Sequence, residues 1–415
     1  MSLLVDAGAS LAKYSALCSS GAQHYPRWWE IGVHLRSLEL TGWRNYEHAR
    51  FWLQTGVNLI FGGNGQGKTS LLEAVQYLAS GRSHRVSEDE ALIHFESSQA
   101  TLRADVVSGD RSHRVEFALR RGQRNQARVN GISQARLQDA TGFVRAILFS
   151  PEDMAIVRGD PADRRRFLDD LLTQRRPAYR AVRQDYERAL RQRNALLREL
   201  RREDGQDGDE ALAAWSEELV NLGARIVAAR LMGCAALREP IQRYYRQLMD
   251  EHGSQRNVRL MLDPATTGSV DQLDELNPDV GEVTQELRAA VAARSREERQ
   301  RGTSLVGPHR DDVCIELDGL PVRTHASQGE AWAIALALRL ASRELLCTDH
   351  DAPITLLDDV FAQLDDHRRR RLGALCSDWE QVLISAAVPD DVPMSGRGVK
   401  VMDGSVDDAM HERER

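Results

Sequence analysis

The sequence has 415 residues, with 55 basic and 62 acidic side chains and a formal net charge of −7. That length predicts roughly two or three domains with a sizeable core, and a content of 42% hydrophobic and 28% charged residues excludes a globally disordered chain. The acidic balance argues against a globally basic nucleic-acid binder but leaves local basic patches open.

Several features indicate a cytoplasmic protein. No uninterrupted apolar run approaches the ~18 residues of a membrane helix, and the N-terminal stretch lacks a basic start, so it is a poor secretory signal. The five cysteines are widely spaced without a C-x-x-C pair, which is typical of reduced thiols and not of a disulfide framework or a zinc site. Only three of the 55 basic residues are lysines, namely Lys13, Lys68 and Lys400.

The N-terminal third predicts strands around one helix. Residues 1–32 lack clear periodicity and are interpreted as an extension, either from a start codon assigned too far upstream or as an ordinary terminus. Strands are expected over 35–46 and 56–61, followed by the segment GGNGQGKT at 62–69 and a helix over 70–79. Residues 114–120 alternate with period two and face 127–132 across a polar turn, which predicts an antiparallel pair.

The middle of the chain predicts an antiparallel helical hairpin. Apolar residues recur at spacings of three and four over 179–200, where Arg193 interrupts the pattern, and again over 212–229. A polar breaker at 203–209 joins the two stretches. The segment 158–203 carries 14 Arg against 8 acidic residues, while 263–285 is acidic and punctuated by Pro and Gly, as in a linker or surface loop.

The C-terminal part returns to alternating strands and helices. A strand over 311–317 ends in the hairpin signal Asp318-Gly319, and a helix is expected over 330–346. The apolar runs 354–359 and 381–385 are typical of buried parallel strands. The polar tail after about residue 403 is expected to be disordered.

The segment 62–69 satisfies the phosphate-binding pattern G-x-x-x-x-G-K-[ST] between a strand and a helix. Glycines let backbone N–H groups wrap phosphate oxygens, and the following helix adds the positive end of its dipole. We predict that Lys68 reaches the β- and γ-phosphates and that the Thr69 hydroxyl binds Mg²⁺. The predicted nucleotide-binding residues of this loop are Gly62, Gly63, Asn64, Gly65, Gln66, Gly67, Lys68 and Thr69.

Two carboxylates end the later apolar strand, at Asp358 and Asp359. With a phosphate loop upstream, Asp358 is predicted to hold Mg²⁺ and Asp359 to position the attacking water. The alternative is a strand end with surface acids. These two residues and Lys68 are the predicted catalytic groups.

A second helix start lies just before that strand, at Ser327-Gln328-Gly329-Glu330. A small hydroxyl, a glycine and a helix N-terminus form another phosphate-binding element, which cannot easily serve the same nucleotide as the first loop. The economical arrangement is a dimer in which this element caps the γ-phosphate on the other subunit. The alternative is a plain helix start in which Ser327 is the N-cap and Glu330 completes a capping box.

These motifs, in this order, resemble the ABC-type ATPase heads of the SMC and Rad50 kind, and more closely the RecF family of bacterial DNA repair proteins. The resemblance covers about 33–405 and rests on six ordered motifs: 35–46, 62–74, 149–169, 307–312, 327–330 and 358–365. It departs from the family's pattern at Trp43, Ser70 and 385–387; the last of these puts a γ-phosphate sensor in doubt.

The resemblance implies an α/β fold: a P-loop mixed sheet with an antiparallel β subdomain, plus an inserted helical hairpin arm. It divides the chain into the extension 1–32, a first head segment 33–165, an arm 166–300, a second head segment 301–405 and a tail 406–415. It also implies that Arg44 and Asn45 lie beside the nucleotide phosphates and that Asp365 lies at a dimer seam.

The function implied by the resemblance is that of an ATP-dependent dimer, with ATP and Mg²⁺ as cofactors, which binds DNA at gaps and helps load recombinase in repair and the SOS response. RecO- and RecR-type mediators are the implied partners. Because Asp359 stands where most such heads have Glu, slow turnover is expected. An alternative is a structural DNA clamp with negligible hydrolysis; a transporter-type ATPase would need a fuller signature, and a small-molecule kinase would lack the hairpin.

The DNA-binding surface is less defined by the sequence. Arg128, Arg136 and the arginines of 158–202 are candidates for phosphate contacts. The alternative is that these arginines form ordinary solvated helix faces.

Overall fold

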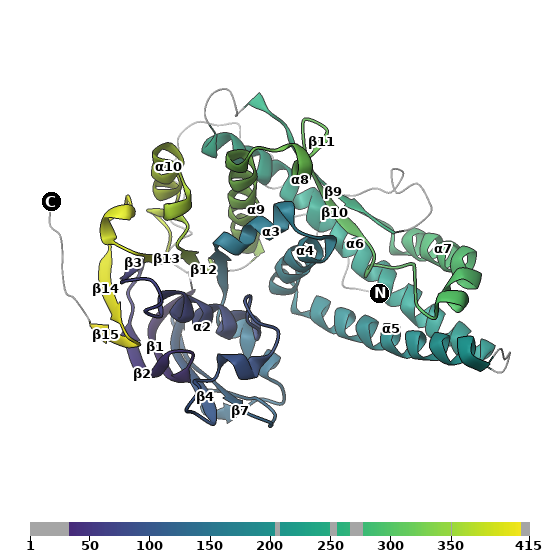
Figure 1. Ribbon diagram of the computed structural model, residues 1–415, viewed down its shortest axis with the longest axis horizontal. Coiled ribbons are helices and arrows are strands. Elements are labelled where there is room, and N and C mark those ends of the chain that lie inside the picture. Colours follow the sequence, from purple (N-terminus) through teal and green to yellow (C-terminus); the bar gives the residue numbers. More distant parts are fainter. Residues whose placement is uncertain (1–32, 204–207, 250–254, 266–276, 350, 408–415) are drawn as a thin grey trace.

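The computed structural model describes residues 33–203, 208–249, 255–265, 277–349 and 351–407. The predicted extension 1–32 lies outside these residues, as does most of the predicted tail. Figure 1 shows most of the strands gathered at one end of the molecule and long helices extending away from them. The architecture is therefore a sheet-containing head with a helical arm.

A mixed sheet forms the centre of the head, in the order β15-β14-β3-β13-β12-β8. All neighbours in it are parallel except the edge pair β14 and β15. Its strands are β3 (Gly56–Phe61), β8 (Ala146–Phe149), β12 (Ile354–Asp358), β13 (Gln381–Ala386), β14 (Arg397–Met402) and β15 (Ser405–Asp407). Segments from both ends of the chain thus combine in one sheet.

The mixed sheet separates two hydrophobic cores. In β12, Leu356 faces one core and Leu357 the other, and in β13 the same alternation separates Leu383 from Ile384. Successive side chains of a strand point to opposite faces, so strands covered on both sides are apolar throughout. The burial of every residue in β12 and β13 confirms the buried parallel strands predicted at 354–359 and 381–385.

An antiparallel sheet and helix α2 (Lys68–Ser80) build the first core. The sheet has the order β2-β1-β4-β5-β6-β7. Its strands are β1 (Val33–Trp43), β2 (Tyr46–Trp52), β4 (Gln99–Ser108), β5 (Arg111–Arg120), β6 (Gln126–Val129) and β7 (Ile132–Ser133). The register that pairs Val115 with Val129 confirms the predicted antiparallel pair.

Helices build the second core on the other side of the mixed sheet (Figure 1). They are α3 (Met154–Arg158), α4 (Pro161–Arg175), α5 (Pro177–Glu203), α6 (Asp209–Leu248), α7 (Val280–Arg301), α8 (Val322–His325), α9 (Gln328–Asp349) and α10 (Asp366–Cys376). Helices α5 and α6 are the predicted hairpin. Helix α6 is long and apolar enough for a membrane span, but 67% of its most apolar window is buried in the chain, as in a core helix.

Three segments differ from the prediction. Part of the predicted loop 263–285 lies outside the described residues, at 266–276; its predicted end is wrong, because α7 begins at Val280, where Asp279 caps the helix through the Gly281 N–H. A strand not predicted, β9 (Val258–Asp263), precedes that loop and pairs with β10 (Asp312–Leu317), which also pairs with β11 (Leu320–Pro321). The disordered tail was predicted to begin at about 403, but β15 continues the sheet to Asp407 because it pairs with β14.

Candidate nucleotide site

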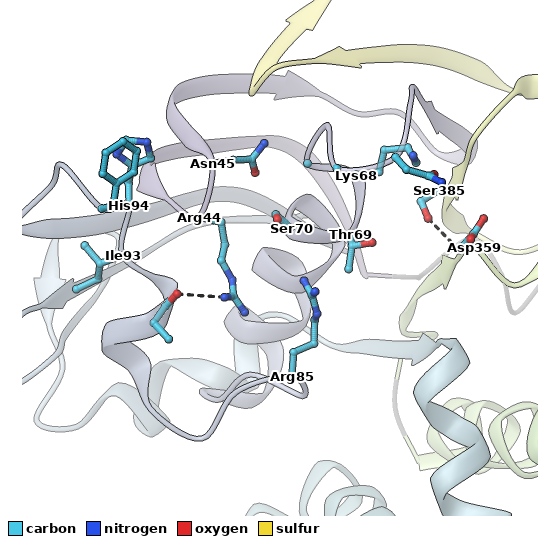
Figure 2. A pocket seen from close by; sticks show the side chains of 15 residues that line it. Arg44, Asn45, Lys68, Thr69, Ser70, Arg85, Ile93, His94, Asp359 and Ser385 are labelled. Carbon is cyan, nitrogen blue, oxygen red and sulfur yellow. Dashed lines mark hydrogen bonds between the residues drawn. The ribbon is translucent and has the colours of Figure 1, made fainter.

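A cavity of about 720 Å³ lies above the phosphate-binding-type loop. Figure 2 shows Lys68, Ser385 and Asp359 at one end of it, His94 and Ile93 at the other, and Arg44 and Arg85 between them. The lining residues come from the loop, α2, the turn after β1, the segment before β4, and the ends of β12 and β13: Arg44, Asn45, Asn64, Gly65, Gly67, Lys68, Thr69, Ser70, Arg85, Ala91, Ile93, His94, Phe95, Asp359 and Ser385.

The loop keeps its shape through glycines and two side chains from the β1–β2 turn. Gly67 has φ 114°, and a Cβ there would lie 2.7 Å from Asn45 Nδ2 and 2.8 Å from the Tyr46 hydroxyl. Those same side chains hold the loop, because Asn45 Nδ2 donates to the Gln66 carbonyl at 3.0 Å and the Tyr46 hydroxyl donates to the Gly67 carbonyl at 2.9 Å. Asn45 therefore supports the loop backbone in addition to lining the cavity.

Gly62 also leaves no room for a side chain. With φ 157°, it would place a Cβ 2.2 Å from the Val401 carbonyl oxygen of β14. On the same side, the Gln66 side chain accepts the Asp403 N–H at 2.5 Å. Gly63, Asn64 and Gly65 are exposed. The loop thus rests on β14, and its outer residues Asn64 and Gly65 line the cavity.

Lys68 is only 8% exposed, and its ammonium donates to the carbonyls of Gly62 at 2.6 Å and Gly63 at 2.8 Å. Burial lowers the pKa of Lys68, an effect that Asp359 and Asp358 oppose. The ammonium therefore lies inside the curve of the loop, where a compact cation with three donors can meet phosphate oxygens.

Two hydroxyls converge on the predicted metal carboxylate. Thr69 Oγ1 donates to Asp358 Oδ1 at 3.0 Å across 289 residues of sequence, and Ser385 Oγ donates to the same oxygen at 2.6 Å. Ser385 Oγ also accepts the Asp359 N–H at 2.9 Å. Asp359 has φ 51°, which is strained for a residue with a side chain, so this bond holds an unfavourable backbone in place.

The donor set fits Mg²⁺ bound together with phosphate. Among the described residues, no cluster of three or more His, Cys, Asp or Glu side chains could hold a metal unaided. Mg²⁺ is usually held by one or two carboxylates, waters and substrate phosphates, and Thr69 with Asp358 supplies that limited set. Burial raises the pKa of Asp358 and of Asp359, which a nearby divalent cation would offset.

Arg44 lines the cavity but is committed to a buried carboxylate. Its Nε and Nη2 donate to Glu73 of α2 at 2.9 and 2.7 Å, and its Nη1 donates to the Ala91 carbonyl at 3.1 Å. Burial would raise the pKa of Glu73, but hydrogen bonds from Arg44 and Ser83 outweigh it and the pKa is lowered. The ion pair fixes the guanidinium at the wall of the cavity.

Seven lining residues lie outside the predicted set: Ser70, Arg85, Ala91, Ile93, His94, Phe95 and Ser385. The rings of His94 and Phe95 are 4.6 Å apart, and Phe95 is 81% exposed. Five of these seven, from Arg85 to Phe95, come from the segment between α2 and β4, which has no periodic pattern. A Phe beside a His in a polar stretch is the one sequence signal that could have marked this segment as part of the site.

The second predicted phosphate-binding element is not part of this cavity. Ser327 and Gln328 are exposed at the start of α9, and the Ser327 N–H donates to Glu330 Oε2 at 2.8 Å while Ser327 Oγ accepts the Glu330 N–H at 3.3 Å. The alternative of a capping box is therefore present. Asp365 is likewise exposed and caps α10, accepting the Arg368 N–H at 2.9 Å. Gly329 lies against the Arg368 side chain.

Several arginines of the basic segment and one of α6 are structural. Arg164 pairs with Asp312 through two bonds of 2.8 Å, and buried Arg230 pairs with Asp169 at 2.9 and 3.0 Å. Arg193 is 2% exposed, so the position that interrupts the apolar pattern is buried. Arg128 and Arg136 are exposed, as are the following arginines of 158–202: Arg158, Arg166, Arg176, Arg188, Arg191, Arg198, Arg201 and Arg202.

Comparison with known proteins identifies the family. A family model described as RecF/RecN/SMC N terminal domain matches residues 34–402. The DNA replication and repair protein RecF of Streptomyces avermitilis is 43% identical over 381 residues, which cover 90% of this chain and 100% of that protein. The RecF of Frankia alni is 44% identical over 373 residues, 89% of this chain and 97% of its own length. The chain belongs to the RecF family.

Solved structures agree with this assignment. The RecF-family chain is similar to a structure of the recombination mediator protein RecF-ATP in the RecFOR pathway, with a TM-score of 0.83, 27% identity, and coverage of 94% of this chain and 100% of that one. An Smc head domain from Pyrococcus furiosus has a TM-score of 0.51 at 17% identity over 90% of this chain and 95% of that one, which shows a shared fold alone. The predicted α/β head with an inserted helical arm is confirmed.

Proposed function

We propose that this RecF-family chain is an ATP-dependent DNA-binding protein of recombinational repair and replication. One observation carries the proposal: Thr69 of the loop donates to Asp358, which lies 289 residues away at the end of β12, and Lys68, Thr69 and Asp359 line the same cavity. A loop for phosphates joined to two carboxylates is the arrangement that nucleoside triphosphate binding requires. The similar RecF structure with ATP supports the choice of nucleotide.

In this proposal, different residues of the cavity bind different parts of the nucleotide. Backbone N–H groups of 62–67 and the start of α2 surround the phosphates, and Lys68 donates to the β- and γ-phosphate oxygens. Thr69 and Asp358 hold Mg²⁺, which supplies positive charge to those oxygens when bound. Arg44, fixed by Glu73, adds a second cation at the wall.

Asp359 orients the attacking water and accepts its proton. Its carboxylate extends from a backbone held by Ser385, and burial raises its pKa, which makes it a better proton acceptor. An Asp is one methylene shorter than the Glu of most such heads, so the water is positioned less directly. Hydrolysis is therefore slow, and nucleotide state acts as a timer for DNA binding.

The exposed helix start of α9 supports a dimer formed on ATP. Ser327 Oγ accepts the Glu330 N–H, so its own proton is free to donate to a further acceptor. Ser327, Gln328 and Gly329 lie outside the cavity of their own chain, and Asp365 is also exposed. We propose that they complete the γ-phosphate site of a second copy and that Asp365 lies at the seam.

The exposed arginines, namely Arg128, Arg136 and those of 158–202, are proposed to contact DNA phosphates, without base specificity, at single-stranded gaps in duplex DNA. The proposal includes RecO- and RecR-type mediators as partners, recombinase loading in the SOS response, and a cytoplasmic location. It divides the chain into head segments 33–165 and 301–405 around an arm at 166–300, with 406–415 as the tail.

DNA affinity measured with ATP and with ADP tests this function. We expect tighter binding of gapped DNA with ATP, and a steep fall of affinity with salt because phosphate contacts release counterions. Lys68→Arg is the control, since a planar guanidinium fits poorly between two phosphates. DNA affinity that is equal with ATP and ADP, or insensitive to salt, would overturn the proposal.

A second candidate, a structural DNA clamp with negligible hydrolysis, shares the same site. The shorter carboxylate of Asp359 favours it. Asp359→Asn discriminates the two, because a clamp keeps full DNA function in this variant whereas the timer loses ATP-driven release.

A further inference from the structure

Three separate segments meet at the side chain of Arg368 in α10. Its Nη1 donates to Asp365 Oδ2 at 2.7 Å, and its Nη2 lies 3.4 Å from the Met249 sulfur at the end of α6. A Cβ on Gly329 would lie 2.9 Å from Nη1 and 3.1 Å from Nη2. The guanidinium thus touches the start of α9, the start of α10 and the end of the arm helix.

Gly329 allows the Arg368 guanidinium to lie close to the start of α9. Any side chain at position 329 would displace the guanidinium. The absence of a side chain on Gly329 therefore leaves the space that Arg368 occupies. The cation itself has one strong acceptor, Asp365, because sulfur accepts only weakly and Nε has no hydrogen-bond partner in the described part of the chain. The position of Arg368 is therefore set by Asp365 and Gly329 together.

Neighbouring arginines tie the same junction to the arm. Arg371, also in α10, donates to the carbonyls of Gln247 at 2.5 Å and Met249 at 2.7 Å. Arg256, beside β9, donates to Glu330 at 2.5 Å, the carboxylate that also binds the Ser327 N–H. The arm end, the α9 start and the α10 start consequently form one connected unit.

We propose that Arg368 is a positioning residue for the composite nucleotide site. It holds Gly329 and Asp365 of one chain as a single face, preorganised for the nucleotide on a second copy, and connects that face to the arm. This inference rests on the proposed ATP-driven dimer. A face whose parts are already fixed loses less conformational freedom when the dimer forms, so dimerisation is stronger.

Arg368→Ala tests the role, with Arg370→Ala as the matched control on the same helix. Arg370 is exposed, and its one side-chain bond within the described part of the chain is to the Asp366 carbonyl of its own helix. We expect Arg368→Ala to bind ATP as monomer with wild-type affinity but to dimerise with ATP about tenfold or more less tightly, the size of one lost charged hydrogen bond. Arg370→Ala should match wild type. If Arg368→Ala unfolds, Arg368→Gln keeps the stem and one donor group and serves instead.

Mixing two defective chains separates a positioning role from general destabilisation. One chain carries Arg368→Ala with an intact loop, and the other carries Lys68→Arg with Arg368 intact. Their heterodimer contains one complete composite site, so ATP should drive differently tagged chains together more tightly than either chain alone. Equal association in the mixture and in the separate chains would overturn the proposal.

A double-mutant cycle gives an independent check. If Gly329→Ala weakens ATP-dependent dimerisation by displacing Arg368, its cost should vanish in the Arg368→Ala background. Additive costs would overturn the coupling. If the wild-type chain forms no ATP-driven dimer, the proposed function is refuted. If the wild-type chain dimerises and Arg368→Ala dimerises with the same dissociation constant, only this inference is refuted.

Discussion

Replacing Arg193 by Met should destabilise the arm, although Arg193 belongs to a segment rich in exposed arginines. Its guanidinium is 2% exposed and donates to Glu298 at 2.6 Å, Ser304 at 2.6 Å and Ser216 at 2.9 Å. Glu298 is fully buried and also accepts the Leu305 N–H at 2.7 Å. One side chain therefore joins α5 to α6, α7 and the loop after α7.

The expected loss of stability follows from the burial of the Arg193–Glu298 ion pair. Without Arg193, the buried Glu298 carboxylate keeps the Leu305 N–H as its single donor, and no cation, among the residues that the structure describes. Removing one partner of a buried ion pair costs about 3–5 kcal/mol. That is a large share of a total stability of about 5–15 kcal/mol. With an m-value of about 1–3 kcal/mol per molar urea, the unfolding midpoint should fall by roughly 1 M or more.

Urea unfolding followed by far-UV circular dichroism measures this shift. Arg191→Met is the matched control, because Arg191 lies on the same helix and is exposed. We expect its midpoint to stay within error of wild type and its DNA affinity to fall in a salt-dependent way. Equal midpoints for the two variants would refute the buried position of Arg193.

Three further outcomes follow from the site and from the arm. Ser385→Ala removes the hydrogen bond of 2.6 Å to Asp358 and the one of 2.9 Å from the Asp359 N–H. Mg²⁺-dependent ATP affinity should therefore fall roughly fivefold. An unchanged Mg²⁺ titration would argue against a role of Ser385 in holding the two carboxylates. Asp359→Asn should slow ATP turnover by about 100-fold or more while ATP-dependent dimers persist. If this variant turns over ATP at the wild-type rate, Asp359 has no catalytic role. Burial lowers the pKa of His309 to about 4 from 6.5, so unfolded chains bind a proton that the folded state rejects; stability is complete above pH 6.5 and falls as pH drops toward 4. His309→Gln, which replaces the titratable imidazole that contacts the Tyr186 hydroxyl, should lose this slope in acid unfolding curves, and an equally steep curve would contradict it.

Local patterns were sufficient to predict the loop and most elements of the head. The segment 62–69 is contiguous, and its neighbours Lys68 and Thr69 are placed by the helix start itself. Ser385 could not be assigned in this way, because its hydroxyl meets Asp358 only through the register of two parallel strands. Strand order in a sheet is a property of the whole chain, which a sequence pattern does not contain.

Arg193 and β9 show the same limit in the arm. A charged residue in an apolar repeat is compatible with a solvated face or with burial, and the choice depends on Glu298, which lies 105 residues away. The strand Val258–Asp263 alternates between buried and exposed residues, yet it precedes an acidic stretch and gains its partner from β10. Tertiary pairing decides both cases.

Sedimentation velocity of the wild-type chain and of Ser327→Arg, with Mg²⁺ and either ATP or ADP, tests the central claim most directly. Ser327 is exposed and outside its own cavity, so an arginine there should leave ATP binding by the monomer intact and clash only with a second copy. We predict that ATP converts wild type from monomer to dimer, that ADP does not, and that Ser327→Arg stays monomeric with ATP bound. A wild-type chain that remains monomeric with ATP, or a Ser327→Arg variant that dimerises as wild type does, would contradict the account.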